Sequence, residues 1–194
     1  MKWLRATCLA FVILLGWTTI SFVISPWHRI YFNLESSDSS ITPVQTASEF
    51  EQSRKLLDSN IIKFLMGGDS RLLNQLPVPE QAHMIDVRNV WRLLVGLTVL
   101  GIAWIAVAKP YRYARLAVVA TGGFGLVTFL SFNPVFDLVH KLFFAHGNWQ
   151  FSDQSPLILT YPYNFFLFMW LSITCLALLT LLAIAYAKNN HEHH

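Results

Sequence analysis

Four long apolar runs constrain this chain more than any other feature of its sequence. Each is close to the roughly 20 residues that an α-helix needs to cross a hydrocarbon core of about 30 Å, and no charged residue interrupts the centre of any run. In lipid the backbone polar groups of such a run must be satisfied within the segment, which favours a helix. The sequence therefore predicts an all-α polytopic membrane protein, with four transmembrane helices and a small, mainly helical extracytoplasmic domain.

The orientation follows from Lys109, Arg112 and Arg115, which crowd the short link between the second and third runs. Basic residues in short loops remain in the cytoplasm, so both termini are predicted to be cytoplasmic. The first run is predicted to be an uncleaved anchor because it exceeds a signal-peptide core and no cleavage site follows it. The predicted segments are transmembrane helices at 1–24, 90–108, 116–138 and 163–187, an extracytoplasmic domain at 25–89, a cytoplasmic loop at 109–115, an extracytoplasmic loop at 139–162 and a cytoplasmic tail at 188–194.

The segment after the first run carries weaker signals. Residues 29–33 indicate a short strand. From Ser48 onward, apolar residues recur at helical spacing up to the pair Gly67 and Gly68, which predicts an amphipathic helix. The dipeptide Pro79-Glu80 is typical of a first helical turn, and from it a helix is predicted to run without a break into the second apolar run.

Two histidines stand at matching depths in this topology. His83 precedes the second run and His140 ends the third, so both are predicted on the outer face, at the ends of neighbouring antiparallel helices. Each has an aspartate three residues away, Asp86 and Asp137, a spacing at which a carboxylate can orient an imidazole and raise its basicity. The plainer interpretation is that an interfacial histidine is a polar anchor, and His28 is predicted to be one.

Other features favour ordinary roles. Cys8 and Cys175 lie in apolar runs and are predicted to be small buried hydrophobes, without a disulfide or a thiolate metal site. The basic residues form no dense patch, so nucleic acid is not an expected partner. His146 is predicted to be a solvated turn residue. The remaining histidines, His191, His193 and His194, form the tail.

The residues around the two histidines resemble a known family. His83-Met84-Ile85-Asp86-Val87 precedes a span, and a segment from Phe136 to Phe144 that holds Asp137 and His140 follows the next span, with Asn148-Trp149 close behind. Together these patterns look like the bacterial lipoprotein intramolecular transacylase family. The resemblance covers the four-span layout and most of residues 56–166, and before residue 56 it is only general.

The resemblance implies an acyltransferase of the bacterial cytoplasmic (inner) membrane. It implies that the sn-2 acyl chain of an S-diacylglyceryl-cysteine moves to the α-amino group of the same cysteine, giving a lyso-form lipoprotein. The expected partners are the diacylated lipoprotein N-terminus and membrane lipid, and no cofactor or metal is expected. The expected site residues are His83 and His140 as catalysts, Asp86 and Asp137 as supports, and Asn148, Trp149 and Phe144 as contacts to substrate or oxyanion.

Two alternatives stay open on the sequence. Two histidines from adjacent helices could instead ligate a haem or a metal ion. The chain could also be a non-enzymatic membrane assembly factor, in which case neither histidine would affect any covalent product.

Overall fold

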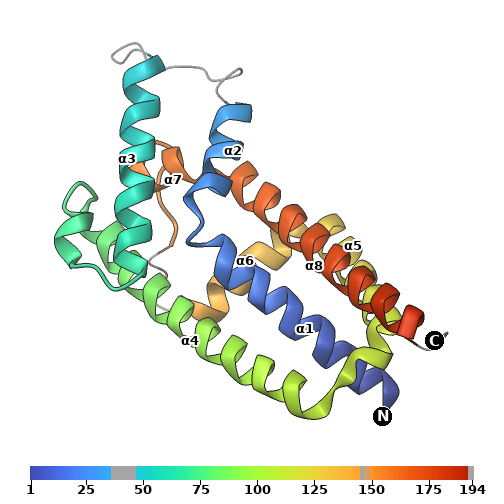
Figure 1. Cartoon of the computed structure of the whole chain (residues 1–194). Coiled ribbons are helices and arrows are strands. Elements are labelled where there is room, and N and C mark those ends of the chain that lie inside the picture. Colours follow the sequence, from blue (N-terminus) through green and yellow to red (C-terminus); the bar gives the residue numbers. More distant parts are fainter. Residues whose placement is uncertain (36–46, 145–146, 148, 192–194) are drawn as a thin grey trace. The chain divides into compact units, whose positions relative to one another are not determined.

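A computed structural model describes residues 1–35, 47–144, 147 and 149–191 (Figure 1). All regular elements in this part of the chain are helices, and four of them are long and apolar enough to cross a membrane, which confirms the predicted fold class. These four candidate spans are α1 (Lys2–Ser21), α4 (Val78–Ala108), the stretch Pro110–Leu130 and α8 (Tyr163–His191) up to Lys188. The stretch Pro110–Leu130 consists of η2 (Pro110–Tyr113) and α5 (Ala114–Leu130). The remaining helices are α2 (Ser25–Glu35), α3 (Ala47–Leu65), η1 (Ser70–Leu73), α6 (Phe132–Phe143) and α7 (Pro156–Thr160).

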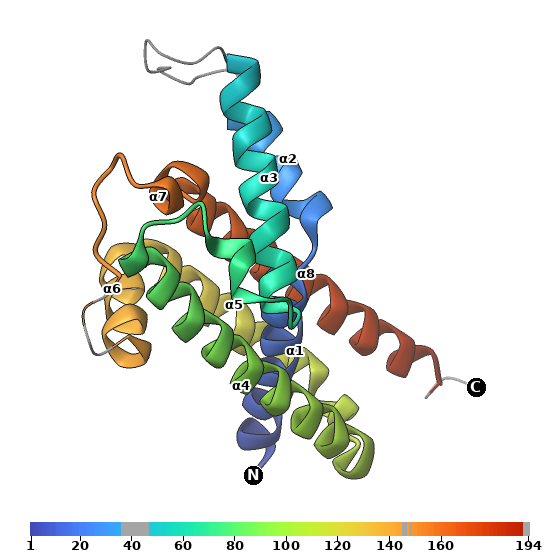
Figure 2. The same cartoon turned by 90° about the vertical axis from the view of Figure 1, so that its left-hand side faces the viewer.

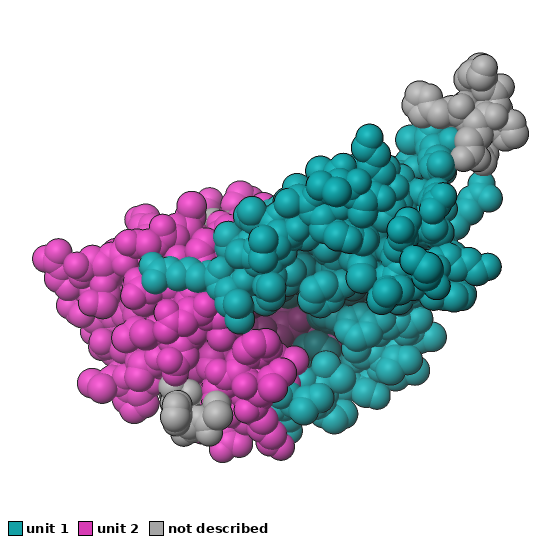
Figure 3. Space-filling model, turned by 90° about the horizontal axis from the view of Figure 1, so that it is seen from below, with its two compact units in different colours: residues 1–21, 92–138, 169–194 teal, residues 22–91, 139–168 magenta. Residues whose placement is uncertain are grey.

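The chain divides into two compact units, coloured separately in Figure 3. Unit 1 consists of Met1–Ser21, Arg92–Leu138 and Met169–His194, and it holds most of the apolar length of the spans. Unit 2 consists of Phe22–Trp91 and Val139–Phe168. Both His83 and His140 belong to unit 2, so the candidate site lies within a single unit.

Unit 1 is built on the close packing of α1 against α5 and η2. Small residues make this approach possible: Ala6 and Ala10 on α1 meet a surface that contains Ala114 and Ala117, and all four are buried. The indole of Trp17 donates a hydrogen bond to Thr180 Oγ1 at 3.0 Å, which joins α1 to α8. Small-residue contacts and interhelical hydrogen bonds of this kind hold helices together in lipid, where apolar burial alone gives little drive.

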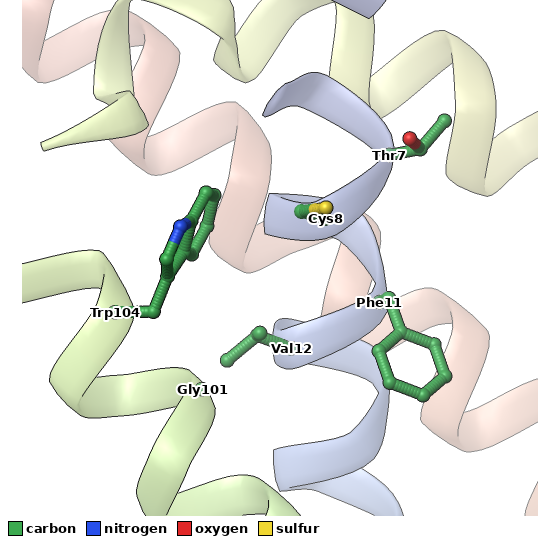
Figure 4. A pocket seen from close by; sticks show the side chains of 6 residues that line it. All are labelled: Thr7, Cys8, Phe11, Val12, Gly101 and Trp104. Atoms are coloured by element: carbon green, nitrogen blue, oxygen red, sulfur yellow. The ribbon is translucent and has the colours of Figure 1, made fainter. Parts of the chain in front are cut away.

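A shallow apolar groove lies beside α1 in the same unit (Figure 4). It is lined by Thr7, Cys8, Phe11, Val12, Gly101 and Trp104. The thiol of Cys8 is half-buried, whereas Cys175 on α8 is exposed, so the predicted burial of Cys175 is wrong. In a span, one side of the helix faces away from its neighbours, and an apolar run cannot show which residues take that side.

Glycines allow two close helix contacts in unit 1. A Cβ on Gly101 of α4 would lie 2.6 Å from Cγ2 and 2.8 Å from Cγ1 of Val12, and a Cβ on Gly125 would lie 2.6 Å from Thr174 Cγ2. By contrast, Gly122 and Gly123 would meet nothing within 4 Å. Of the glycines in the third span, only Gly125 is used for a close approach.

Gly101 and Gly96, both on α4, form a matched pair for a stability prediction. Gly101→Ala should lower the thermal midpoint (Tm) of the purified protein, because overpacking against the stiff Val12 costs about 1–3 kcal/mol and outweighs a helix-propensity gain of about 1 kcal/mol. Gly96→Ala should leave Tm unchanged or raise it, because its new methyl group meets nothing within 4 Å. Equal Tm values for the two variants would contradict the close approach of Gly101 to Val12.

The third candidate span, Pro110–Leu130, begins and ends earlier than the predicted 116–138. The apolar helix α5 ends at Leu130, Ser131 leaves the helical region (φ −118°, ψ 33°), and α6 begins at Phe132. Pro134 explains the break, because a proline has no N–H to donate to the carbonyl of Leu130 and its ring would clash there. In the first turn of a new helix the missing N–H does no harm. His140 therefore belongs to a separate short helix.

Unit 2 is organised around α3, the predicted amphipathic helix, which ends before Gly67 (φ 111°) as expected. Its apolar face is buried against η1, the first turns of α4 and α7, forming one core cluster. The buried members are Leu57, Ile61, Phe64, Leu65, Leu73, Leu76, Met84 and Leu157.

The strand predicted at residues 29–33 is wrong, because these residues lie in α2 (Figure 2). Pro26 stands in its first turn, and the buried His28, Tyr31 and Phe32 share one helical face that packs beside α3. The β-branched and aromatic side chains of this segment raise strand propensity, but tertiary packing overrides that preference.

Candidate active site

Helix α4 positions His83. The predicted unbroken helix through His83 is confirmed, since α4 extends from Val78 to Ala108. Glu80 and Met84 are buried on the face of α4 that packs into the core of unit 2, and Val87 continues that face. His83 lies next to Met84 in the sequence, at the edge of this packed face, and is half-buried. The imidazole is thus held by the fold and still partly accessible.

Helix α6 and the turn after it position His140. The N–H of Phe144 donates to the carbonyl of His140 at 2.8 Å, so the helical course continues to Phe144, whose ring is buried. Gly147 has a φ of 71°, in the left-handed region that favours glycine, and its N–H donates to the carbonyl of Phe144 at 3.0 Å. Trp149, two residues after Gly147, packs its ring on that of His140.

Both imidazoles pack on the same phenyl ring. The ring centroid of Phe144 lies 4.6 Å from that of His83 and 5.5 Å from that of His140. The two histidine rings are therefore no farther apart than the sum of these two distances. Trp149 lies 4.9 Å from His140, and Phe151 lies 5.5 Å from His83, measured between ring centroids. Three aromatic rings thus surround a pair of titratable groups.

The other predicted site residues are placed differently. Asp86 is half-buried, one turn after His83 on α4, whereas Asp137 is exposed, one turn before His140 on α6. Asn148 lies outside the described residues, as does His146. In the described part of the chain, no group of three or more His, Cys, Asp or Glu side chains could hold a metal ion. The orienting roles of the two aspartates stay predictions.

Glu80 is a buried carboxylate, whereas its sequence neighbours indicate only a first-turn residue. It is 3% exposed, and its Oε2 accepts a hydrogen bond from the backbone N–H of Leu157 at 3.1 Å. Leu157 is in the first turn of α7, where Ser155 also caps the helix by accepting from the N–H of Ile158 at 3.4 Å. Glu80 therefore joins α4 to the loop that carries Trp149 and Phe151.

A second group of buried polar side chains joins three elements of unit 2. His28 Nδ1 lies 2.6 Å from Asp58 Oδ1, and the hydroxyl of Tyr161 donates to the same oxygen at 2.8 Å. His28 and Asp58 are 4% and 1% exposed, so the prediction that His28 is an interface anchor is wrong. His28 shares the buried face of α2 with Tyr31 and Phe32. These residues follow His28 at intervals of three and four, which is the sequence pattern that indicates a buried helical face.

Arg54 ties the same region together one turn earlier on α3. Its guanidinium is buried, pairs with the carboxylate of Glu35, and stacks over the ring of Phe32 with Cζ 4.2 Å from the ring centroid. Its Nε donates to the carbonyl of Thr160 at 3.2 Å. Arg54 and Asp58 on α3 thus hold Thr160 and Tyr161, which lead directly into α8.

The Tyr161 contact gives a pH prediction. Burial, together with the charge and hydrogen bond of Asp58, raises the pKa of Tyr161 well above its ordinary value of 10.0. The folded protein therefore holds the phenol proton more tightly than the unfolded chain does. The contribution of Tyr161 to the free energy of unfolding is complete below pH 10, and it is lost as the pH rises toward the pKa of Tyr161 in the folded state. Tyr161→Phe should lower Tm by a constant amount up to about pH 10, where free tyrosine ionises, and the deficit should narrow above it.

Thermal melts of wild type and Tyr161→Phe across this pH range check the prediction. The exposed Tyr111 of η2 offers a matched control, since Tyr111→Phe should show no such pH-dependent deficit. A Tyr161→Phe deficit that widens with rising pH would contradict the assignment.

Fold and site together define a polytopic helical membrane protein with a pair of histidines packed against aromatic rings. The chain belongs to the family described as lipoprotein intramolecular transacylase Lit, which it matches over residues 3–166. It is therefore an acyltransferase.

Comparison with solved structures shows the same fold. The chain is similar to the membrane-integral lipoprotein intramolecular transacylase Lit from Bacillus cereus, with a TM-score of 0.65 and 21% identity over 98% of this chain and 93% of that chain. A structure of the Bacillus cereus protein with a single histidine-to-arginine mutation gives a TM-score of 0.60 and 18% identity, over 100% of this chain and 93% of that chain. No curated protein matches the chain.

Proposed function

We propose that this protein moves the sn-2 acyl chain of an S-diacylglyceryl-cysteine to the α-amino group of that same cysteine, producing a lyso-form lipoprotein. The observation that carries the proposal is the placement of the His83 and His140 rings against one phenyl ring, 4.6 Å and 5.5 Å from it between centroids. Membership of the transacylase family supports the same reaction class.

The reaction needs proton transfers and no covalent enzyme intermediate. The amine nitrogen attacks the sn-2 ester carbonyl, a tetrahedral oxyanion forms, and the bond from that carbon to the glyceryl oxygen breaks. One proton leaves the amine nitrogen and one reaches the glyceryl alkoxide, so the product is an isomer of the substrate. Since an ester becomes an amide, the step is downhill and requires no nucleotide. Amine and ester belong to one molecule, and holding them together gives a large effective molarity.

The histidines are suited to both proton transfers. A free α-amino group has a pKa of about 7.7–8.0 and is largely protonated at neutral pH, while a histidine near 6.5 can act as its base. We assign His140 as the base and His83 as the partner that stabilises the oxyanion or protonates the leaving alkoxide. Asp86 and Asp137 support the imidazoles, and the Trp149 indole and Asn148 are the proposed oxyanion donors.

The aromatic surroundings favour this chemistry. Phe144 is buried beneath both imidazoles, and Trp149 and Phe151 pack on them, so the reacting groups meet a largely apolar surface. Lower local dielectric strengthens the interaction of a donor with a developing oxyanion. It also disfavours hydrolysis, which would release the acyl chain instead of transferring it.

We place the site at the outer face of the bacterial cytoplasmic membrane, with both termini in the cytoplasm. The positive-inside argument from Lys109, Arg112 and Arg115 supports this orientation. A lipoprotein N-terminus presents its lipidated cysteine at that face, with the acyl chains in the bilayer. The partners are therefore the diacylated lipoprotein and the surrounding membrane lipid.

Co-expression with a lipoprotein in a bacterium that leaves its lipoproteins diacylated tests the proposal. Because substrate and product have the same mass, the readout is tandem mass spectrometry of the N-terminal lipopeptide. The proposal predicts fragments with one acyl chain on nitrogen and one on the glyceryl group, and loss of the reactive amine. Fragments with both chains on glyceryl, identical with and without the protein, would refute it.

A further inference from the structure

Glu80 occupies a position in the candidate site that its role as a first-turn residue does not explain. It lies three residues before His83 on α4, so the two side chains belong to the same side of the helix. Its carboxylate is 3% exposed and accepts the N–H of Leu157 at 3.1 Å. A buried carboxylate is costly to keep unless its hydrogen bonds are satisfied, and here the donor belongs to a loop segment distant in sequence.

The loop that Glu80 contacts is the one that encloses the imidazoles. Trp149 and Phe151 pack on His140 and His83, and the chain then turns through a hydrogen bond from the N–H of Ser155 to the carbonyl of Ser152 at 2.9 Å and enters α7. Thr160 and Tyr161, after α7, are already fixed to α3 by Arg54 and Asp58. Glu80 fixes the other end of α7, because it accepts the hydrogen bond from Leu157 in the first turn of that helix. This end is the one closer in sequence to Phe151.

We infer that Glu80 is a positioning residue for the acyl-transfer site: by binding Leu157 it fixes the Trp149–Phe151 segment against the two imidazoles. This inference rests on the proposed function. Catalytic groups held by packed neighbours lose rate steeply when their placement shifts by about 1 Å, up to 10²-fold. Because the loop retains its other anchors, a smaller loss is expected here.

The test compares two substitutions of similar size in the full-length protein. Glu80→Gln keeps an oxygen that accepts from the N–H of Leu157, and Glu80→Met keeps the volume but removes the acceptor. With a synthetic diacylated lipopeptide as substrate, Glu80→Met should lower kcat about tenfold with KM nearly unchanged, and Glu80→Gln should restore most of the rate. Hydrogen exchange of the 149–155 segment should rise in Glu80→Met only.

Asp69 provides the matched control, because it also caps a short helix, accepting the N–H of Arg71 at 2.8 Å on the exposed surface of unit 2. Asp69→Ala should retain the wild-type kcat. A Glu80→Met protein with wild-type kcat, an equal loss in Glu80→Gln, or a Glu80→Met protein that does not fold would each overturn the inference. An inactive wild type, or an active His83→Ala, would instead reject the proposed function, so the two failures are distinguishable.

Discussion

Replacement of His83 or His140 by alanine should lower kcat for acyl transfer by about 10²–10⁴, the range that general acid–base catalysis contributes. The double variant should lose little more than either single one, because groups that act in one step are not additive. The measurement is the rate of conversion of a synthetic diacylated lipopeptide by each purified variant.

A loss of activity in the alanine variants must be distinguished from a loss of folding. Each imidazole packs on Phe144, so alanine removes a contact as well as a proton carrier. His83→Gln and His140→Gln keep more of the packing and should be equally inactive at a Tm close to that of wild type. His191→Ala, at the end of α8, is the histidine control and should be fully active. Wild-type rates for either glutamine variant would exclude that histidine from catalysis.

Asp58→Ala should destabilise unit 2 strongly. Asp58 is 1% exposed and its Oδ1 accepts from Tyr161 and contacts His28 at 2.6 Å. Its removal takes a hydrogen-bond acceptor from the buried His28 and from the Tyr161 hydroxyl, and breaking a buried pair such as His28–Asp58 costs about 3–5 kcal/mol. For a chain of this size that corresponds to a fall in Tm on the order of 10 °C.

Asp58→Asn should cost less, because the amide oxygen still accepts a hydrogen bond from the Tyr161 hydroxyl. Asp69→Ala, which removes the surface cap of η1 in the same unit, should lower Tm by only a few degrees, because the loss of an N-cap costs about 1 kcal/mol. Thermal unfolding of the purified variants gives the ranking. If Asp58→Ala and the Asp69→Ala control have the same Tm, the network of His28, Asp58 and Tyr161 does not hold α2, α3 and the start of α8 together.

Features set by neighbouring residues were predictable from the sequence. The apolar runs predicted four spans because length and composition alone decide whether a helix can cross a membrane. Pro79-Glu80 indicated the start of the long helix through His83, and Gly67 with Gly68 indicated the end of α3. Pro134 is a local signal for the break between α5 and α6. The apolar character of residues 116–138 nevertheless favours a single continuous span.

Contacts between distant residues were not predictable. The hydrogen bond of Glu80 crosses 77 residues of sequence, and the one between Tyr161 and Asp58 crosses 103. Helical periodicity identifies a buried face but does not identify the partner that a polar residue on that face will meet. The neighbours of His28 and Glu80 in the sequence indicate only an interface anchor and a first-turn residue, whereas the fold buries both.

The most direct test of the acyl shift is a crossover experiment with purified protein. One diacylated lipopeptide carries an isotope label in its sn-2 chain, and a second, with a different peptide sequence, is unlabelled. Transfer within one molecule, catalysed at His83 and His140, predicts the label on the amine of the first peptide only, and product formation slowed at least about 10²-fold in the double His83→Ala/His140→Ala protein. Label on the amine of the second peptide, or undiminished product from the double variant, would contradict the account.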